Sequence, residues 1–224
     1  EHNGKFWQFK VPEPMPQVPL GHHIRPYQDP HPPIAVSGLH KASESLFTAG
    51  ANGWIPMSIN YLPAVNLNTH WDAVCEGAKS TGRPAPRRSE WRIAREVFVG
   101  KTDQEARDHV LNGPIGRAYT DYMYNVLKSL GATDLYKGDP DMPDEALTAE
   151  YVCDNIWVVG SPDTVAEKLS KLYDDVGGFG TVLQIQYTYE PHQIWYDNMD
   201  LFANKVMPSL AHLVPEDEPA AAAQ

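Results

Sequence analysis

Short apolar runs that resemble β-strands alternate with helix signals along most of this chain. The strand-like runs cover residues 33–37, 54–59, 91–99 and 181–186, and a helical pattern follows each of them. Such alternation is typical of a parallel sheet with right-handed crossovers. A complete eight-stranded βα barrel takes about 250 residues. This chain spends 224 residues on four such units, so the pattern predicts either half a barrel or a small open sheet.

Capping residues mark several helix boundaries. Thr102 to Glu105 forms a capping box, and Ser161 followed by Pro162 supplies an N-cap and a first helical position. Helices are therefore predicted over 41–50 (closed by Gly50), over 69–81, from 102 to a break at 113–114, onward to Gly131, from 161 to 177–178, and after Pro191. Residues 132–148, rich in Asp, Pro and Gly, are predicted to form an exposed insertion.

The junction between the first strand and its helix reads Ser37-Gly38-Leu39-His40. Glycine permits a tight turn, and a helix beginning near Lys41 would direct free N–H groups and the positive end of its dipole at this point. Phosphate is the ligand that suits such a junction. The alternative is that Ser37-Gly38 is only a turn, because strand–Gly–helix junctions are common.

Composition excludes several classes of partner. The formal net charge is −11 and no basic stripe is present, so nucleic acid and anionic membrane surfaces are poor partners. No apolar run approaches the roughly 20 residues that span a membrane. Cys75 and Cys153 have no metal-binding spacing, which favours a reduced, cytoplasmic setting without a disulfide. The histidines do not form a zinc pattern either, so no metal site is predicted.

The two ends of the chain differ from its middle. Residues 1–31 carry many prolines and few periodic apolar positions, which predicts an extended segment lying over a surface. Residues 215–224 are acidic and then Ala-rich, which predicts a disordered tail. The chain begins at Glu1 rather than Met, which suggests that processing or truncation has removed an upstream part.

Six stretches together carry a resemblance to a known family. They are HNGKFW at 2–7, PYQDPHPPIAV at 26–36, AGANGW at 49–54, FVGKTDQEAR at 98–107, VGSPDTVAEKL at 159–169 and LFANKVMP at 201–208. In this order they resemble the bacterial luciferase-like flavin monooxygenases, with the limonene and alkanal monooxygenases as the suggested relatives. The resemblance covers nearly the whole chain.

The resemblance implies a (β/α)8 barrel of which residues 1–214 form the C-terminal half. It implies an enzyme that uses reduced FMN, or a deazaflavin in some relatives, and O₂ to oxygenate a small apolar substrate such as a terpene or an aldehyde. A separate flavin reductase is an implied partner. The missing N-terminal half, or a second copy of the chain in a homo-oligomer, is also expected to associate, because an incomplete barrel exposes strand edges. Without that half, flavin binding is expected to be weak or lost.

The resemblance also places the flavin phosphate on Ser37, Gly38, Leu39 and His40, with backbone N–H groups as the main donors. Catalytic residues are left unassigned. The ends of predicted strands offer Ser58, Asn60, Gln184, Gln186 and Tyr187, although each of these is more often a loop or packing residue. Further candidates explained equally well by capping or packing are His70 and His192, and Trp54, Tyr61 and Trp71 are candidates for an aromatic wall.

Two other functions remain open from the sequence. One is a non-catalytic flavin-binding or interaction protein of the same descent. The other is an unrelated phosphate-binding barrel enzyme, such as an isomerase, which would need an acid and a base at strand ends. The carboxylates near the strands do not meet that need, because Glu96 lies inside a predicted strand and Glu190 lies beyond the last one.

Overall fold

The computed structural model describes residues 1–11, 17 and 26–214. The predicted extended segment therefore falls partly outside the described residues, and the predicted tail falls wholly outside them. The chain divides into two units, Glu1–Ile34 and Ala35–Gln224. In the first unit, β1 (His2–Asn3) and β2 (Gln8–Phe9) form a short antiparallel pair.

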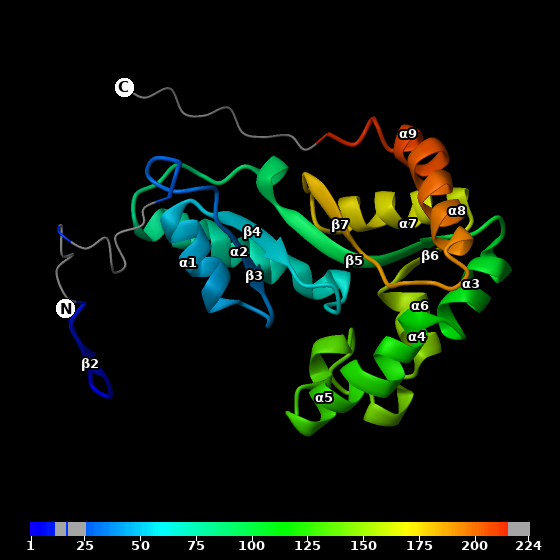
Figure 1. Ribbon diagram of the computed structural model, residues 1–224, viewed down its shortest axis with the longest axis horizontal. Coiled ribbons are helices and arrows are strands. Elements are labelled where there is room, and N and C mark those ends of the chain that lie inside the picture. Colours follow the sequence, from blue (N-terminus) through cyan, green and yellow to red (C-terminus); the bar gives the residue numbers. More distant parts are fainter. Residues whose placement is uncertain (12–16, 18–25, 215–224) are drawn as a thin grey trace. The chain divides into compact units, whose positions relative to one another are not determined.

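The second unit is built on a five-stranded parallel sheet (Figure 1). Its strands are β3 (Ala35–Gly38), β4 (Ile55–Ser58), β5 (Arg92–Val99), β6 (Val158–Gly160) and β7 (Thr181–Ile185). The order is β3-β4-β5-β6, and β7 also pairs with β5. The four predicted strands are all present, and the predicted parallel α/β architecture is confirmed. The apolar run near 156–159 adds β6.

The helices are α1 (Glu44–Asn52), α2 (Ala64–Ser80), α3 (Asp103–Leu111), α4 (Pro114–Arg117), α5 (Tyr124–Ser129), α6 (Ala149–Asn155), α7 (Pro162–Asp175), α8 (Gln193–Leu201) and α9 (Met207–Ser209). The two predicted caps form. Thr102 Oγ1 accepts from the Glu105 N–H at 3.1 Å, and Ser161 Oγ accepts from the Thr164 N–H at 3.4 Å. No described helix combines the length and apolar character that a membrane crossing requires.

The pairing register separates the side chains of the sheet into two faces, because residues opposite one another point to the same side. The outer face packs on helices: Val36 contacts the Leu46–Ala49–Val74 cluster, and Val97 packs with Val165 and Leu169 of α7. The inner face carries Ala35, Ser37, Ile55, Met57, Ala94, Glu96, Leu183 and Ile185.

Much of the inner face is incompletely covered within the described chain. Ala35 is exposed, and Ile55, Met57, Leu183 and Ile185 are only partly buried. Apolar side chains on the concave side of a complete βα barrel are packed against those of the opposite strands. The sheet therefore has the geometry of an incomplete barrel wall.

Two predicted helix boundaries are wrong. Helix α1 begins at Glu44 rather than near Lys41, and it continues through Gly50 to Asn52, with Gly53 at φ 70° as its C-cap. Helix α2 begins at Ala64 rather than at Thr69, because the apolar spacing of Trp71 and Val74 extends back to the buried Leu67.

Gly50 is needed inside α1 because α1 and α2 approach closely. A Cβ added at Gly50 would lie 2.0 Å from the Val74 carbonyl oxygen, and one added at Gly77 of α2 would lie 2.0 Å from the Phe47 carbonyl oxygen. The two glycines thus let each backbone touch the other helix. A glycine inside a helix signals close packing here, and not the end of the helix.

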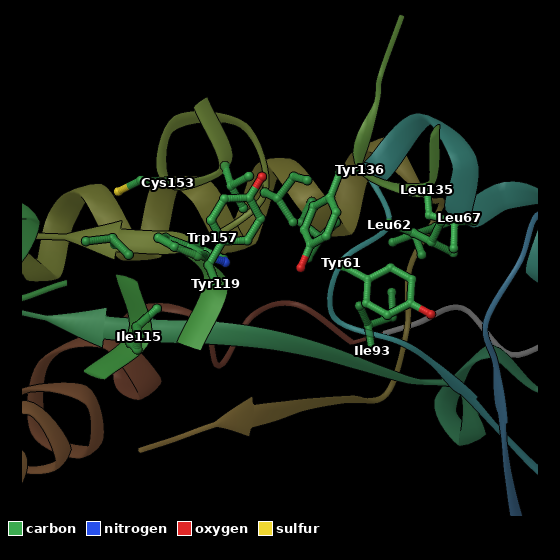
Figure 2. Close-up of a cluster of buried hydrophobic side chains, with 14 of the residues drawn as sticks. Tyr61, Leu62, Leu67, Ile93, Ile115, Tyr119, Leu135, Tyr136, Cys153 and Trp157 are labelled. Carbon is green, nitrogen blue, oxygen red and sulfur yellow. The ribbon is translucent and has the colours of Figure 1, made fainter. Parts of the chain in front are cut away.

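The predicted exposed insertion at 132–148 is wrong for its apolar residues. Leu135, Tyr136 and Leu147 are buried in the largest hydrophobic cluster (Figure 2). The Tyr119 ring meets the Tyr136 ring edge-on at 5.2 Å between centroids, and the Tyr119 hydroxyl donates to the Leu147 carbonyl at 2.6 Å. A few aromatic and aliphatic anchors bury a segment whose composition is otherwise polar.

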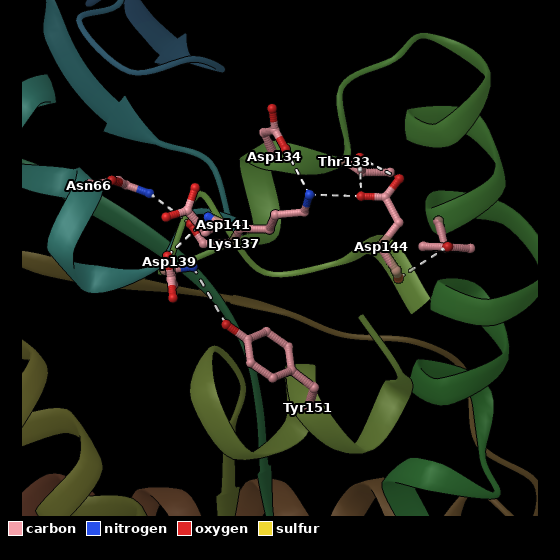
Figure 3. Close-up of polar contacts among 10 residues, drawn as sticks. Asn66, Thr133, Asp134, Lys137, Asp139, Asp141, Asp144 and Tyr151 are labelled. Atoms are coloured by element: carbon pink, nitrogen blue, oxygen red, sulfur yellow. Dashed lines mark hydrogen bonds and ion pairs between the residues drawn. The ribbon is translucent and has the colours of Figure 1, made fainter. Parts of the chain in front are cut away.

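Lys137 holds the same segment in place (Figure 3). Its ammonium group lies 2.9 Å from Asp134 and 2.7 Å from Asp144, and these partners raise the pKa of Lys137. Thr133 donates to Asp144 at 3.0 Å, and Asn66 of α2 donates to the Lys137 carbonyl at 3.3 Å. The segment is therefore tied both to itself and to α2.

The close approach of α1 and α2 gives a stability prediction. Gly50→Ala is expected to lower the free energy of unfolding by about 2 kcal/mol or more, because the backbones must separate to admit the methyl group. Urea denaturation measures the change. The control is Gly82→Ala, at φ 70° with open space around it, which is expected to cost only about 1 kcal/mol for the left-handed backbone. Equal effects of the two substitutions would contradict the close-packing explanation.

Candidate functional site

The predicted phosphate loop lies between β3 and α1 and opens to solvent. Leu39, His40, Lys41 and Ala42 are exposed, and within the described residues the backbone N–H groups of His40 and Lys41 have no acceptor. The N-cap residue of α1, Ser43, makes no side-chain cap. The start of α1 therefore leaves backbone donors available for an anion.

The turn in this loop is not made where the sequence predicted it. Gly38 is extended like the rest of β3, whereas Ala42 has φ 49° and donates its N–H to Thr69 Oγ1 at 3.1 Å. Gly38 is instead required by packing, since a Cβ there would lie 2.5 Å from Leu46 Cδ1 and 2.9 Å from His70 Cε1. The expected role of Gly38 in turning the chain is corrected.

His70 of α2 supports the loop at 38–42 through a series of buried hydrogen bonds. Its Nε2 lies 2.9 Å from the His40 carbonyl oxygen, its Nδ1 lies 2.9 Å from Ser58 Oγ, and Trp91 Nε1 donates to Ser58 Oγ at 2.9 Å. A carbonyl only accepts, so Nε2 must carry the proton, and Nδ1 then accepts from the Ser58 hydroxyl. With His70 neutral, both of its ring nitrogens, the Ser58 hydroxyl and the Trp91 N–H each have a hydrogen-bond partner.

Burial favours that neutral form. His70 is fully buried, and burial lowers its pKa, with the positive charge of Arg95 acting in the same direction. Of the roles that the sequence left open for His70 and Ser58, internal support of the loop is the one their contacts favour. Neither residue has a polar atom left over for a ligand.

The loop after β4, residues 59–62, is held by two neighbouring residues of β5. Arg95 donates to the carbonyls of Ile59 at 3.4 Å, Asn60 at 3.2 Å and Leu62 at 2.8 Å. Asn60 Nδ2 in turn donates to Glu96 Oε1 in a short hydrogen bond. Burial lowers the pKa of Arg95 to about 10, so the guanidinium remains charged at neutral pH.

Glu96 is a functional candidate that the sequence reasoning set aside. It lies on the inner face and is only 5% exposed, and its Oε2 has no hydrogen-bond partner in the described chain. Burial raises the pKa of Glu96 to about 7, although the hydrogen bond from Asn60 acts in the opposite direction. Glu96 was excluded because it lies inside a predicted strand. Adjacent Arg and Glu residues in a strand that is otherwise mostly apolar could have indicated a functional position.

Tyr61 connects the two loops. Its hydroxyl donates to the Leu39 carbonyl in a long bond of 3.4 Å, and its ring lies 5.6 Å from that of Tyr136 (Figure 2). Tyr61 therefore lies between the phosphate loop and the aromatic cluster that covers Glu96. It is the one member of the predicted aromatic wall in this position.

The other predicted wall residues pack elsewhere. Trp54 packs against the α1 cluster, and Trp71 stacks on Trp91 at 5.3 Å between ring centroids, both on the outer face. Gln184 lies opposite Arg95 in the register and so points outward, and Gln186 donates to the Val97 carbonyl at 2.9 Å. These side chains do not reach the inner face.

Of the remaining candidates, Tyr187 lies near Glu96, whereas His192 contacts residues 189 and 190 of its own segment. Tyr187 is close enough to Glu96 for that carboxyl's charge to raise the pKa of Tyr187, although burial is the larger cause. His192 Nδ1 lies 3.0 Å from the Tyr189 carbonyl and 3.1 Å from Glu190. Among the described residues, no three His, Cys, Asp or Glu side chains gather as metal ligands would.

Comparison with known proteins identifies the family. Residues 1–178 match the family described as luciferase-like monooxygenase. The chain belongs to this family. The match covers well over half of the sequence and contains five of the six stretches that carry the resemblance.

Individual relatives agree. The chain is 32% identical over 216 residues to the 3,6-diketocamphane 1,6-monooxygenase of Pseudomonas putida, covering 93% of this chain and 56% of that protein. It is 21% identical over 186 residues to the limonene 1,2-monooxygenase of Rhodococcus erythropolis, covering 83% and 45%. The solved structure of the oxygenating constituent of 3,6-diketocamphane monooxygenase from Pseudomonas putida, in complex with FMN, matches with a TM-score of 0.75 over 93% of this chain and 57% of that one.

The chain therefore spans about half the length of the relatives it matches. This agrees with the four βα units counted in the sequence and with the incompletely covered inner face. The prediction of a luciferase-like barrel represented by about half of its length is confirmed.

The buried His70 gives a pH prediction. Its pKa is lowered in the folded state, so below about pH 6.5 the unfolded chain binds a proton that the folded chain does not. The contribution of His70 to the free energy of unfolding is therefore expected to be present above pH 6.5 and to decline as the pH falls below it. Urea denaturation at several pH values measures this.

His70→Gln is the comparison for this measurement, because it cannot titrate. Glu96 contributes with the opposite sign: its raised pKa makes the folded state hold a proton between about pH 4.5 and 7, so its contribution declines as the pH rises. Only the difference between wild type and His70→Gln isolates the histidine. An identical pH dependence in the two proteins would refute the assignment.

Proposed function

We propose that the protein containing this chain is an FMN-dependent monooxygenase that uses O₂ to oxygenate a small apolar molecule. The observation that supports this most is the loop that precedes α1: residues 39–42 are exposed, and the His40 and Lys41 N–H groups have no acceptor within the described residues. Tyr61 joins this loop to the inner face. A phosphate in the loop would place the rest of a flavin within reach of that face.

The loop fits the phosphate group of FMN. His40 and Lys41 offer unpaired backbone N–H groups, α1 contributes the positive end of its dipole, and the Lys41 side chain adds a charge. Glu44 in the first turn of α1 opposes this in part. The proposed cofactor site is therefore the junction of Ser37, Gly38, Leu39 and His40 extended to Lys41, with the His40 and Lys41 N–H groups as the donors. Bound FMN would supply the redox chemistry with O₂.

The inner face suits an apolar substrate. Ile55, Met57, Leu183 and Ile185 line it, and the matched relatives are named for diketocamphane and limonene. A cyclic terpenoid or a related ketone is the substrate class we propose. The residues here would exclude water from the site and hold the substrate beside the cofactor.

Two partners follow from this proposal. A separate flavin reductase would supply reduced FMN. The remainder of the barrel, in the same protein or in an associated chain, would cover the inner face and complete the pocket. A deazaflavin is the alternative cofactor, and its affinity relative to that of FMN distinguishes the two.

The test is a titration of the purified whole protein that contains this chain with FMN and with riboflavin, which lacks the phosphate, followed by flavin fluorescence quenching. FMN is expected to bind more tightly than riboflavin. Lys41→Glu is expected to weaken FMN binding about five- to tenfold, as a like charge near an exposed anion does, and to leave riboflavin binding unchanged. A deazaflavin is titrated in parallel.

The matched control is Lys79→Glu, which makes the same charge change at an exposed position near the end of α2. It is expected to alter neither affinity. Equal binding of FMN and riboflavin, or equal effects of the two lysine substitutions, would rule out the proposed phosphate site.

A further inference from the structure

Strand β5 places a cation and a carboxyl next to each other on opposite faces of the sheet. Arg95 lies opposite Gln184 and points outward, whereas Glu96 lies opposite Ile185 and points inward. Both are almost completely buried. They are neighbours in sequence, but they contact different parts of the protein.

The two side chains hold the loop at 59–62 from both sides. Arg95 binds three of its carbonyl oxygens, and Glu96 accepts from the Asn60 side chain. Removing either residue would leave buried backbone or amide groups without partners, which is costly. The loop is therefore fixed more firmly than its lack of regular structure suggests.

Tyr61 couples the loop at 59–62 to the loop at 38–42. Its backbone lies between Asn60 and Leu62, both of which are held by β5, and its hydroxyl donates to the Leu39 carbonyl. A shift of the loop at 59–62 must therefore move or break the contact to Leu39.

The hydrogen bonds around Glu96 suit a neutral acid. Asn60 donates to Oε1, which is then the carbonyl oxygen, and Oε2 has no donor facing it in the described chain. The neutral acid leaves one O–H at Oε2 without an acceptor, whereas the carboxylate leaves a buried charge with a donor at one oxygen only, which costs more. Arg95, the nearby cation, makes its hydrogen bonds to carbonyls on the other face. Burial raises the pKa of Glu96 by more than the backbone N–H of Glu96 and the charge of Arg95 lower it. The titratable groups facing Glu96 are Tyr136 and Tyr187, whose raised pKa values keep them uncharged.

We propose that Glu96 is a positioning residue for the flavin site: in its neutral form it holds Asn60 and, through Tyr61, sets the position of the phosphate loop at 38–42. This inference rests on the proposed function, because the loop it positions is the proposed FMN site. Ionisation of Glu96 disfavours the arrangement, since it buries a charge that no cation of the described chain contacts directly. The loop is then held less firmly as the pH rises through 7.

The first experiment measures how firmly the loop at 38–42 is held in the absence of any cofactor. Hydrogen exchange of the Ala42 amide, the loop N–H that is hydrogen-bonded (to Thr69 Oγ1), is followed by NMR at pH 6 and pH 8 and corrected for the intrinsic rate. Wild type is expected to lose protection at pH 8. Glu96→Gln, which keeps an acceptor for Asn60 but cannot ionise, is expected to be equally protected at both pH values. Glu96→Leu is expected to lose about tenfold in protection at both.

Tyr61→Phe tests the connection. It removes only the hydroxyl that contacts Leu39, so the pH dependence of Ala42 exchange is expected to disappear in this variant while the amides of α7 keep their protection. If Glu96→Leu does not fold, the comparison of wild type, Glu96→Gln and Tyr61→Phe is sufficient. Persistence of the pH dependence in Glu96→Gln or in Tyr61→Phe would overturn the proposal.

The second experiment repeats the FMN and riboflavin titrations with the same variants. FMN affinity is expected to fall about tenfold in Glu96→Leu and to follow the loop protection in the others. Normal FMN binding in all variants would overturn this inference and leave the proposed function intact. Absence of FMN binding in wild type, with the exchange results as expected, would overturn the proposed function and leave the coupling between Glu96 and the loop standing.

Discussion

Strand β5 is the element on which the rest of the unit depends. It pairs in parallel with β4, β6 and β7, and every residue after Arg92 is buried. Because paired residues share a face, the register of this one strand decides which side chains meet the helices and which line the inner face. A slip of one residue would move Glu96 to the helix-covered side and Arg95 to the inner side, and both would lose their partners.

The loops that follow the strands depend on buried polar contacts rather than on repeated structure. His70 supports the loop at 38–42 through the His40 carbonyl, and Arg95 supports the loop at 59–62 through three carbonyls. Both supports come from residues outside the loop they hold, on elements that are rigid because they are packed. This is how a barrel presents precise geometry from irregular segments at the carboxyl ends of its strands.

The sequence pattern was sufficient to predict the strands of the sheet, but not the buried polar contacts that hold the loops. Strands β3, β4, β5 and β7 follow from local apolar runs, and the caps at Thr102 and Ser161 follow from side-chain chemistry within four residues. Gly50 was misread because its neighbour, Val74, lies on another helix. Tyr136 was misread because segment composition does not reveal one buried aromatic residue. The roles of Ser58, His70 and Glu96 depend on partners that are 12 to 36 residues distant in sequence, and no local pattern encodes them.

Glu96, a buried polar residue that holds a loop, affects stability differently from an apolar packing residue. An apolar side chain of similar size at this position would bury as well and would remove the cost of an oxygen without a partner. It could not bind Asn60, and the loop carrying Tyr61 would then lose its hydrogen bond to the inner face of β5. A carboxyl here lowers stability in exchange for a defined loop position. Positions where a protein departs from the locally favourable choice are expected to be those where geometry serves function, and Glu96 is connected through Asn60 and Tyr61 to the loop that we propose holds a phosphate.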